Sequence, residues 1–268
     1  MTATSPSTAP GRPVPAVASQ PVLGIPLALT DYTRALDWID GVIDAGERAY
    51  VCVAAVHTVM ESQEDPELRE AVLASDVTVP DGMPLVWAMN LLGHSLSSRV
   101  YGPDLMERAC ERAAITGRRF YLYGGRPEAL EILREELPRR YPGLQIAGAR
   151  PGPFRALEPD EAEGIASELN AAEPDVVWVG LGVPLQEKFM RVMRERLEAP
   201  VLVGVGAAFD FHAGLKRQAP ETLQRLGLEW AFRLSQEPRR LWRRYLRYNP
   251  RFVIGFARQY LRHLRGPR

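Results

Sequence analysis

Short apolar runs alternate with amphipathic stretches along the first 220 residues of the chain. The apolar runs are candidate strands and span residues 50–56, 77–79, 120–123, 145–147, 176–179 and 201–205. Between them, apolar positions recur at helical spacing near residues 31–45, 66–74, 83–93, 104–117, 127–140, 159–172 and 185–198. Strands that are apolar throughout and alternate with helices are typical of a parallel sheet that is buried on both faces. The pattern therefore predicts an α/β fold with a Rossmann-like parallel sheet flanked by helices.

Two changes in this pattern predict domain boundaries. From Glu221 only helical spacing continues, so we expect a core over residues 21–220 and a helical appendage over residues 221–268. The first twenty residues are rich in Pro, Ala, Ser and Thr and lack the basic start and apolar centre of a signal peptide. We expect residues 1–20 to be a disordered tail. Because no run reaches the roughly 18 uncharged apolar residues of a spanning helix, we expect a soluble or surface-bound protein.

Charge is unevenly distributed along this neutral chain. Residues 221–268 contain twelve arginines, no lysine and three glutamates, a local excess of nine positive charges. Apolar anchors recur among these arginines at helical spacing, at Leu241, Tyr245, Tyr248 and Phe252, and Pro250 should kink or divide the helix. A basic helix with such anchors suits an anionic membrane surface, and it could self-associate when no membrane is present. Dense arginine also suits nucleic acid, with the aromatic residues as stacking platforms, but the helical spacing favours the membrane.

The two cysteines, Cys52 and Cys110, lie in apolar stretches and have neither metal-ligand nor disulfide-framework spacing. Buried thiols of this kind are typical of a reducing compartment. We therefore expect a cytoplasmic protein that lies on the inner face of the cell membrane.

Four strand-to-helix junctions are rich in glycine or carry an acid. They are Pro80-Asp81-Gly82, Gly124-Gly125-Arg126-Pro127, Gly180-Leu181-Gly182-Val183-Pro184 and Gly204-Val205-Gly206. Ligands of parallel sheets bind where strands end and helices begin, and glycine lets the backbone approach a phosphate. None of the four is a complete dinucleotide fingerprint or phosphate loop. A nucleotide ligand and simple turn geometry both remain open readings of these glycines.

Asp81 has two readings of its own. An aspartate just before a helix can cap it by accepting hydrogen bonds from the free amides of the first turn. A carboxylate at the rim of a parallel sheet can also serve as a catalytic base.

Six segments, taken in order, resemble the WecG/TagA/CpsF glycosyltransferases, also called glycosyltransferase family 26, from about residue 22 to residue 246. They are "PDGMPLVWAMNLLG" (80–93), "RVYGPDLMERAC" (99–110), "FYLYGGRPEALE" (120–131), "PDVVWVGLGVPLQEKFM" (174–190), "VLVGVGAAFDFHAGLKRQAP" (201–220) and "GLEWAFRLSQEPRRLWRRYL" (227–246). The resemblance implies transfer from a UDP-sugar, usually a UDP-N-acetylhexosamine, to a polyprenyl-diphosphate-linked saccharide. Such products feed teichoic acid, enterobacterial common antigen and capsule or exopolysaccharide synthesis.

The resemblance also implies inversion at the anomeric centre without a metal or other cofactor. The sequence agrees on the metal, because it has no Asp-x-Asp motif and its four histidines show no ligand spacing. By the resemblance, Asp81 matches the base that takes the proton of the acceptor hydroxyl. Gln186 matches a residue near the donor, where it would bind sugar or uracil; otherwise it is an exposed residue at a helix start.

Further site residues follow from the same motifs. Arg99 would meet a diphosphate, whereas Asp104 would cap the next helix or contact substrate. Asp210 is either paired within the fold or bound to donor hydroxyls, and His57 is either structural or part of the site. Among the glycine-rich junctions, we expect Gly124, Gly125 and Gly182 to approach the donor. Arg233, Arg240 and Arg243 are candidates to neutralise the leaving diphosphate.

One departure from the family pattern concerns the donor. Val53 and Ala55 stand where many relatives carry Thr and Asn, which removes two potential hydrogen bonds and favours an altered sugar specificity. Two rival functions remain open. A nicotinamide-dependent oxidoreductase would need a third glycine after Gly180-Leu181-Gly182, where this chain has Leu185. The other rival is a non-catalytic protein that binds membrane or polynucleotide through the basic appendage.

Overall fold

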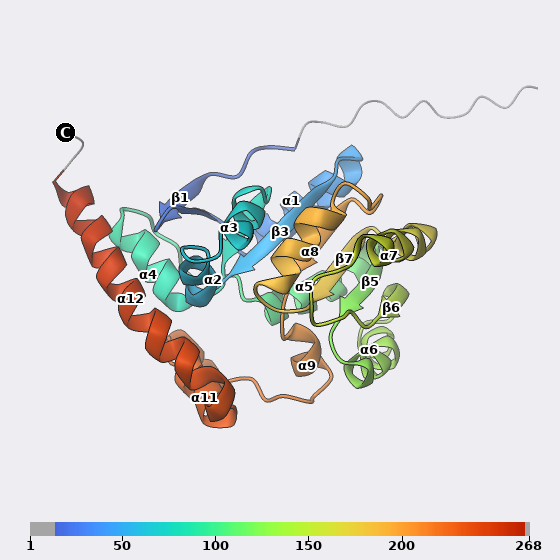
Figure 1. Ribbon diagram of the computed structural model, residues 1–268. Helices are drawn as coiled ribbons and strands as arrows, with labels where there is room; N and C mark the ends of the chain where they lie inside the picture. The colour runs from blue at the N-terminus through green and yellow to red at the C-terminus, as the bar shows by residue number, and fades with distance from the viewer. Residues whose placement is uncertain (1–13, 266–268) are drawn as a thin grey trace, which may run out of the picture.

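Six parallel strands form the central sheet of the protein, whose computed structural model describes residues 14–265 (Figure 1). In spatial order the strands are β4 (Val77–Pro80), β3 (Ala49–Ala54), β8 (Val201–Gly204), β7 (Val176–Gly180), β5 (Arg119–Gly124) and β6 (Gln145–Arg150). Every strand predicted from an apolar run is present, and each pairs in parallel with its neighbours. The predicted Rossmann-like α/β fold is confirmed.

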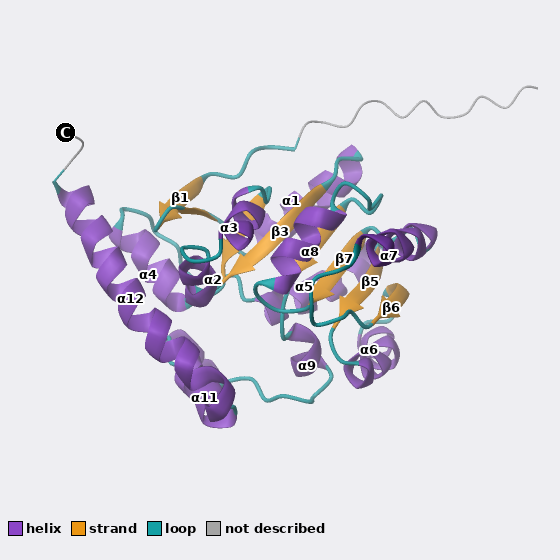
Figure 2. Cartoon of the chain, in the orientation of Figure 1, coloured by secondary structure: helices purple, strands orange, loops and turns teal. Residues whose placement is uncertain are grey.

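Helices cover both faces of this sheet, as the purple and orange layers of Figure 2 show. On one face, Val51 and its equivalents pack against α1 (Tyr32–Ala45), α5 (Gly102–Thr116) and α6 (Pro127–Arg140). On the other face, Cys52 and its equivalents pack against α7 (Pro159–Ala171) and α8 (Leu185–Met193). Because successive strand residues point to opposite faces, burial of both faces requires the continuous apolar runs seen in the sequence.

A short antiparallel hairpin lies beside the β4 edge and was not expected from the sequence. It consists of β1 (Ser19–Val22) and β2 (Ile25–Ala28), and it packs with α2 (Val56–Glu61), α3 (Pro66–Leu73) and α4 (Met83–Leu91). Its prolines argue against a strand in the sequence, but prolines are tolerated in edge strands. Since β1 begins at Ser19, ordered structure enters the segment that was expected to be a disordered tail; residues 1–13 of that segment lie outside the described residues.

The expected appendage consists of α10 (Glu221–Arg225), α11 (Glu229–Gln236) and α12 (Pro238–Leu264). Figure 1 shows the red helix α12 running alongside α4 and α2 at one side of the molecule. Phe252 and Phe256 are buried against this side of the core, and the side chain of Gln259 bonds Leu23 N and Pro21 O of the hairpin at 2.8 Å each. The helix does not divide at Pro250: it runs as one element from Pro238 to Leu264. Within the described residues, no helix is long and apolar enough to cross a membrane.

The carboxyl ends of the strands meet at one edge of the sheet. Ala54 at the end of β3 is in register with Pro80 at the end of β4, and Gly124 of β5 is in register with Gly180 of β7. The backbone continues this alignment beyond the strands, since Asp81 N donates to Ala54 O at 2.8 Å. The loops that follow the strands therefore converge, together with α9 (Ala208–His212), next to the appendage.

Candidate active site

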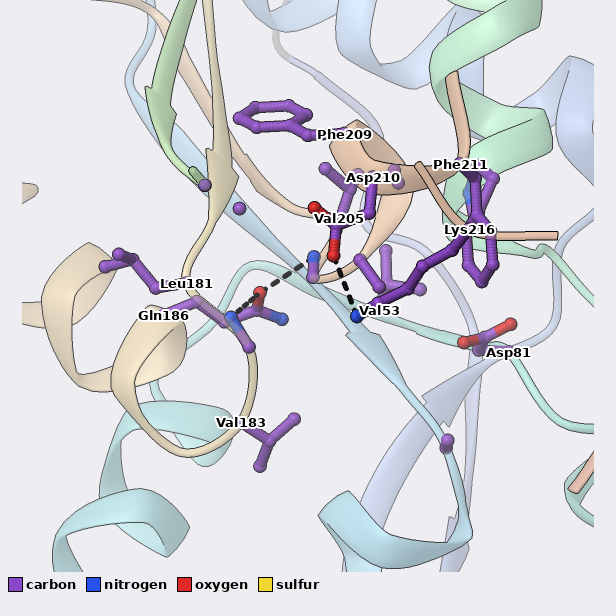
Figure 3. Close-up of a pocket in the computed structure, with 18 of the residues that line it drawn as sticks. Val53, Asp81, Leu181, Val183, Gln186, Val205, Phe209, Asp210, Phe211 and Lys216 are labelled. Carbon is purple, nitrogen blue, oxygen red and sulfur yellow. Dashed lines mark hydrogen bonds and ion pairs between the residues drawn. The ribbon is translucent and has the colours of Figure 1, made fainter. Parts of the chain in front are cut away.

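A pocket of about 330 Å³ lies at this edge of the sheet, where strand-end loops face α9, α11 and α12 (Figure 3). It brings together eight of the predicted site residues: His57, Asp81, Gly125, Gly182, Gln186, Asp210, Arg233 and Arg240. The other four, Arg99, Asp104, Gly124 and Arg243, lie outside its lining. Two thirds of the predicted site therefore converges in space.

Asp81 does not cap the helix that follows it. The N-cap of α4 is Gly82, and no side chain bonds its first turn. The Oδ1 atom of Asp81 is buried, and it has no hydrogen-bond partner within residues 14–265. Burial raises the pKa of Asp81 to about 7, with Arg99 and Arg233 opposing the rise and Glu229 and Asp104 adding to it. A buried carboxylate that lacks a partner and titrates near neutrality can accept a proton from a bound hydroxyl.

Gln186 connects two loops of the pocket and is not an exposed residue at a helix start. It is only 2% exposed, and its Oε1 accepts from Gly182 N at 3.1 Å and from Gly206 N at 2.9 Å, as the dashed lines in Figure 3 mark. Its Nε2 donates to Oε1 of the fully buried Glu187 at 2.9 Å. Gln186 thus fixes the loops after β7 and β8 relative to each other, and its amide oxygen is already engaged.

Asp210 is paired within the fold, which is one of the two alternatives that the sequence left open, and it also lines the pocket. Lys216 Nζ lies 2.8 Å from Asp210 Oδ2, and both side chains are largely buried in the pocket wall. Lys216 also lies 3.7 Å from Glu237 at the junction of α11 and α12. Lys216 was missed in the sequence, although it lies inside the motif that contains Asp210 and is one of only two lysines in an otherwise arginine-rich chain.

The floor of the pocket is apolar at Val53 and Ala55, the two positions from which the sequence favours an altered sugar specificity. Val53, Ala55 and Val205 line this part of the cavity, and Figure 3 shows Lys216 extending toward Val53. These three side chains have no hydrogen-bonding group. Side-chain hydrogen bonds to a ligand in this part of the pocket would therefore come from neighbours such as Lys216.

All three predicted glycines have a positive φ, and two of them, Gly125 and Gly182, line the pocket. Gly125 lines the pocket with a φ of 75°, and a Cβ atom there would lie 2.8 Å from Phe209 Cδ2. Gly182 lines it with a φ of 76°, a region that residues with a side chain rarely adopt. Gly124 has a φ of 91° and lies against Leu181 behind the pocket, so it serves turn geometry.

Three arginines of the appendage line the pocket, and one of them differs from the prediction. Arg233 lies over the Phe211 ring at 5.8 Å, and Arg240 and Arg244 follow one turn apart on α12. The predicted Arg243 is instead stacked on Trp242 at 5.3 Å. The arginine that follows one position later reaches the site, because residues four apart share a helix face.

Arg99 and Asp104 make contacts within the fold. Arg99 Nη1 donates to Glu229 Oε2 at 2.5 Å, Nη2 donates to Gln224 Oε1 at 2.8 Å, and the guanidinium stacks 4.0 Å from the Tyr101 ring centre. Asp104 is not the helix cap that was expected, because the N-cap of α5 is Tyr101. Its Oδ2 accepts from the Tyr32 hydroxyl at 3.1 Å.

His57 lies in the first turn of α2 and lines the pocket. Burial, with Arg244 and Arg233 nearby, lowers the pKa of His57 to about 3. The imidazole is therefore neutral at physiological pH, and it brings no additional positive charge to the site.

A second cavity, an apolar groove of about 590 Å³, runs between α4 and α12. Its walls carry Met83, Trp87, Leu91, Trp230, Phe252, Val253, Phe256 and Tyr260, and it shares Ala55, His57, Asp81 and Arg233 with the pocket. Asp81 thus lies where a charged pocket meets an apolar groove. The exposed side chains of Trp87 and Val253 form part of the rim of the groove.

Comparison with known proteins agrees with this arrangement. The model of the Glycosyl transferase WecG/TagA/CpsF family matches residues 20–266. A protein of Bacillus spizizenii named N-acetylglucosaminyldiphosphoundecaprenol N-acetyl-beta-D-mannosaminyltransferase is 32% identical over 213 residues, which cover 80% of each chain. Since the family model spans the core, the pocket and the appendage together, the chain belongs to the WecG/TagA/CpsF family of glycosyltransferases.

Proposed function

We propose that this glycosyltransferase moves an N-acetylhexosamine, or a related hexose, from a UDP-sugar to a polyprenyl-diphosphate-linked saccharide. The observation that carries the proposal is the position of Asp81, a carboxylate with a free oxygen at the junction of the charged pocket and the apolar groove. A transferase that joins a charged donor to a lipid-linked acceptor needs these two cavities to meet at its base.

The charged pocket suits the donor. Lys216, Arg233, Arg240 and Arg244 line it, and cations of this kind stabilise the charge that develops on a departing diphosphate. We propose that they do so without a metal ion. The apolar floor at Val53 and Ala55 suits a methyl group of the donor sugar, such as that of an acetamido substituent, better than a hydroxyl.

The apolar groove suits the acceptor. The name of the Bacillus relative specifies an acceptor sugar on diphosphoundecaprenol, which is an apolar chain attached to a diphosphate. In this chain the aromatic walls of the groove would hold the first isoprene units, and the acceptor sugar would then lie at Asp81. Each buried CH₂ group contributes about 0.8 kcal/mol to such binding.

The arrangement of carboxylates supports a single displacement. The acceptor hydroxyl attacks the anomeric carbon, the bond from that carbon to the phosphate oxygen breaks, UDP leaves with the electron pair, and Asp81 takes the hydroxyl proton. Asp210 is the other carboxylate in the pocket lining, and Lys216 neutralises it. With one free carboxylate acting as a base, the expected outcome is inversion at the anomeric centre.

The outer face of α12 supports a peripheral position on the inner surface of the cell membrane. Leu246, Val253, Ile254, Leu261 and Leu264 are exposed along this helix, among its arginines. Arginine and lysine close to an anionic surface contribute about 1 kcal/mol each. Because the groove opens beside this exposed strip, a lipid-linked acceptor would enter it from the membrane.

The experiment that tests the function is a screen of UDP-sugars for transfer to a polyprenyl-diphosphate-linked N-acetylglucosamine, with detection of the disaccharide-lipid product. UDP titration, with NAD and an oligonucleotide as controls, separates the two rivals. An oxidoreductase would bind NAD, and a polynucleotide-binding protein would bind the oligonucleotide in preference to UDP. Product formation from at least one UDP-sugar is expected.

A further inference from the structure

Glu229, in the first turn of α11, is a buried acid that the proposed function has not used. Its side chain is 12% exposed, whereas that of Glu221, another acid of the appendage, is 76% exposed. Its two carboxylate oxygens face two different arginines. Oε2 accepts from Arg99 Nη1 at 2.5 Å, and Oε1 lies 4.0 Å from Arg233 Nη1. Glu229 therefore joins an arginine of the core to an arginine of the appendage.

Both of these arginines act on Asp81. Asp81, Arg99, Glu229 and Arg233 all line the apolar groove between α4 and α12, together with His57 of α2 and Tyr245 of α12. Tyr32 of α1 and Tyr101 and Asp104 at the start of α5 also lie close enough for their charges to interact with that of Asp81. Arg99 and Arg233 favour the ionised carboxylate, and Glu229 disfavours it. A buried ion pair adds little net stability, so the fold alone gives weak reason for this cluster.

We propose that Glu229 is a positioning residue for the transfer reaction, which holds Arg99 and Arg233 beside Asp81 and offsets their charge. This inference rests on the proposed role of Asp81 as the base. A carboxylate that faced two uncompensated guanidinium groups would be a weaker base, because its ionised form would be overstabilised. Since Glu229 belongs to α11, the environment of the base is complete only when the appendage lies on the core.

Removing the charge of Glu229 and removing that of Arg99 should shift the pH dependence of transfer in opposite directions. The base works in its ionised form, so kcat/KM rises with pH through the pKa of Asp81. Glu229→Gln removes a negative charge and should move this acidic limb about one unit toward lower pH, with a threefold to tenfold lower plateau. Arg99→Gln removes a positive charge from the other side of the same pair and should move the limb toward higher pH. A purely structural role for the pair would not shift the limb in opposite directions.

The test is a set of pH–rate profiles of the full-length wild type, Glu229→Gln and Arg99→Gln, with Glu221→Gln as the matched control. Glu221 pairs with Arg225 on the surface of α10, so its profile should coincide with that of the wild type. Hydrogen exchange over α11 shows whether each variant keeps the appendage in place. If Glu229→Gln does not fold, the Arg99→Gln profile tests the proposal alone: a shift of its acidic limb toward higher pH supports the proposal, and no shift or a shift toward lower pH overturns it.

Opposite shifts of the two variants support the proposal. Acidic limbs that coincide with the wild type, or that shift in the same direction, overturn it and leave the proposed function intact. If the wild type transfers no sugar from any UDP donor, the proposed function and this inference fail together.

Discussion

The chemistry of single residues in the pocket depends on whether their neighbours bind their polar atoms. Asp81 keeps a free carboxylate oxygen because Gly82 occupies the cap position of α4, and burial then brings its pKa close to neutrality. Asp210 is of the same residue type and lies in the same pocket, but its ion pair with Lys216 satisfies it. The two carboxylates can therefore have different roles, one as a base and the other as part of the wall.

Lys216→Met should weaken donor binding. The substitution removes a cation from the pocket and leaves the carboxylate of Asp210 unpaired, close to where the diphosphate would lie. A hydrogen bond to a charged group contributes about 1.5–3 kcal/mol, so the dissociation constant for UDP should rise by about tenfold or more. Titration calorimetry with UDP measures this.

The matched control for Lys216→Met is Lys188→Met. Lys188 is the other lysine of the chain, and it pairs with Asp65 and Glu67 on the outer side of α8. UDP should bind this control with wild-type affinity. If Lys216→Met binds UDP as tightly as the wild type does, the diphosphate does not contact Lys216.

The sequence predicted such sites only where a motif or a local pattern pointed to them. Asp81 and Gly182 were predictable because a strand end, a turn and a helix start are visible locally. The contacts of Gln186 and Asp210 are made with residues 20 and six positions away, at Gly206 and Lys216, which the sequence does not reveal. Glu229 contacts Arg99 across 130 residues of chain, which no local pattern indicates.

At the scale of elements, apolar periodicity predicted the strands of the sheet and the amphipathic helices that cover it, and it missed short elements that pack at the β4 edge. All six strands of the sheet were predicted, because each carries a run of apolar or small residues, including β6, which lies at the edge of the sheet and is only half-buried. The hairpin β1–β2 and the short helix α2 were missed. Their few apolar residues are buried by α4 and α12, which are distant in the sequence, so no local period marks them. Helix α12 itself was predicted, but the groove beside it requires the placement of α4, which the sequence does not supply.

Ala257→Trp on α12 should obstruct the groove. Ala257 lines it, so a bulky indole there would displace part of the acceptor chain. Loss of two buried CH₂ groups costs about 1.6 kcal/mol, which corresponds to a little over tenfold in the KM for a polyprenyl acceptor. The KM for the UDP-sugar should stay unchanged, because the donor occupies the other cavity.

Leu261→Trp provides the comparison for Ala257→Trp. Leu261 is exposed one turn further along α12 and lies outside the lining of the groove. This variant should keep the wild-type KM for both substrates. An Ala257→Trp enzyme that accepts the long-chain acceptor normally would show that the lipid binds elsewhere.

At the scale of the whole molecule, the appendage lies between the pocket and an exposed apolar strip on the surface of the protein. Its inner face supplies Arg233, Arg240 and Arg244 to the pocket, and its outer face carries an apolar strip among arginines. The sequence places a boundary near residue 220, where strand–helix alternation gives way to helices alone. In the structure, the core and the appendage nevertheless pack together at the hairpin, at α4 and at the pocket. In the proposed function, α12 therefore contributes both to the active site and to membrane contact.

Membrane binding should depend on the exposed strip of α12. Full-length protein should float with anionic vesicles, and Leu246→Glu with Leu264→Glu should abolish this, since each change places a carboxylate at an anionic surface. Ile115→Glu, at an exposed apolar residue of α5, is the control that should still float. The membrane role would be contradicted if the wild-type protein did not bind vesicles but self-associated, or if it bound an oligonucleotide and shifted its electrophoretic mobility.

Turnover should survive chelation. Five cationic side chains line the pocket, Arg126, Lys216, Arg233, Arg240 and Arg244, and we expect them to neutralise the departing diphosphate without a divalent metal. The measurement is the transfer rate in EDTA compared with the rate in Mg²⁺ or Mn²⁺. A rate that collapses in EDTA and recovers when either ion is added would show that the arginines are insufficient.

The most direct test of the account is the transfer rate of Asp81→Asn, with polyprenyl-diphosphate-linked N-acetylglucosamine and the best UDP-sugar donor. Asparagine has the size of aspartate but cannot take the proton, so the variant should fold and bind UDP normally. Its turnover should fall by about 10²–10⁴-fold. Asp160→Asn, at an exposed position of α7, controls for the substitution itself and should transfer at the wild-type rate. If Asp81→Asn retains turnover close to the wild type, the base lies elsewhere and the junction of the two cavities is not the reaction centre.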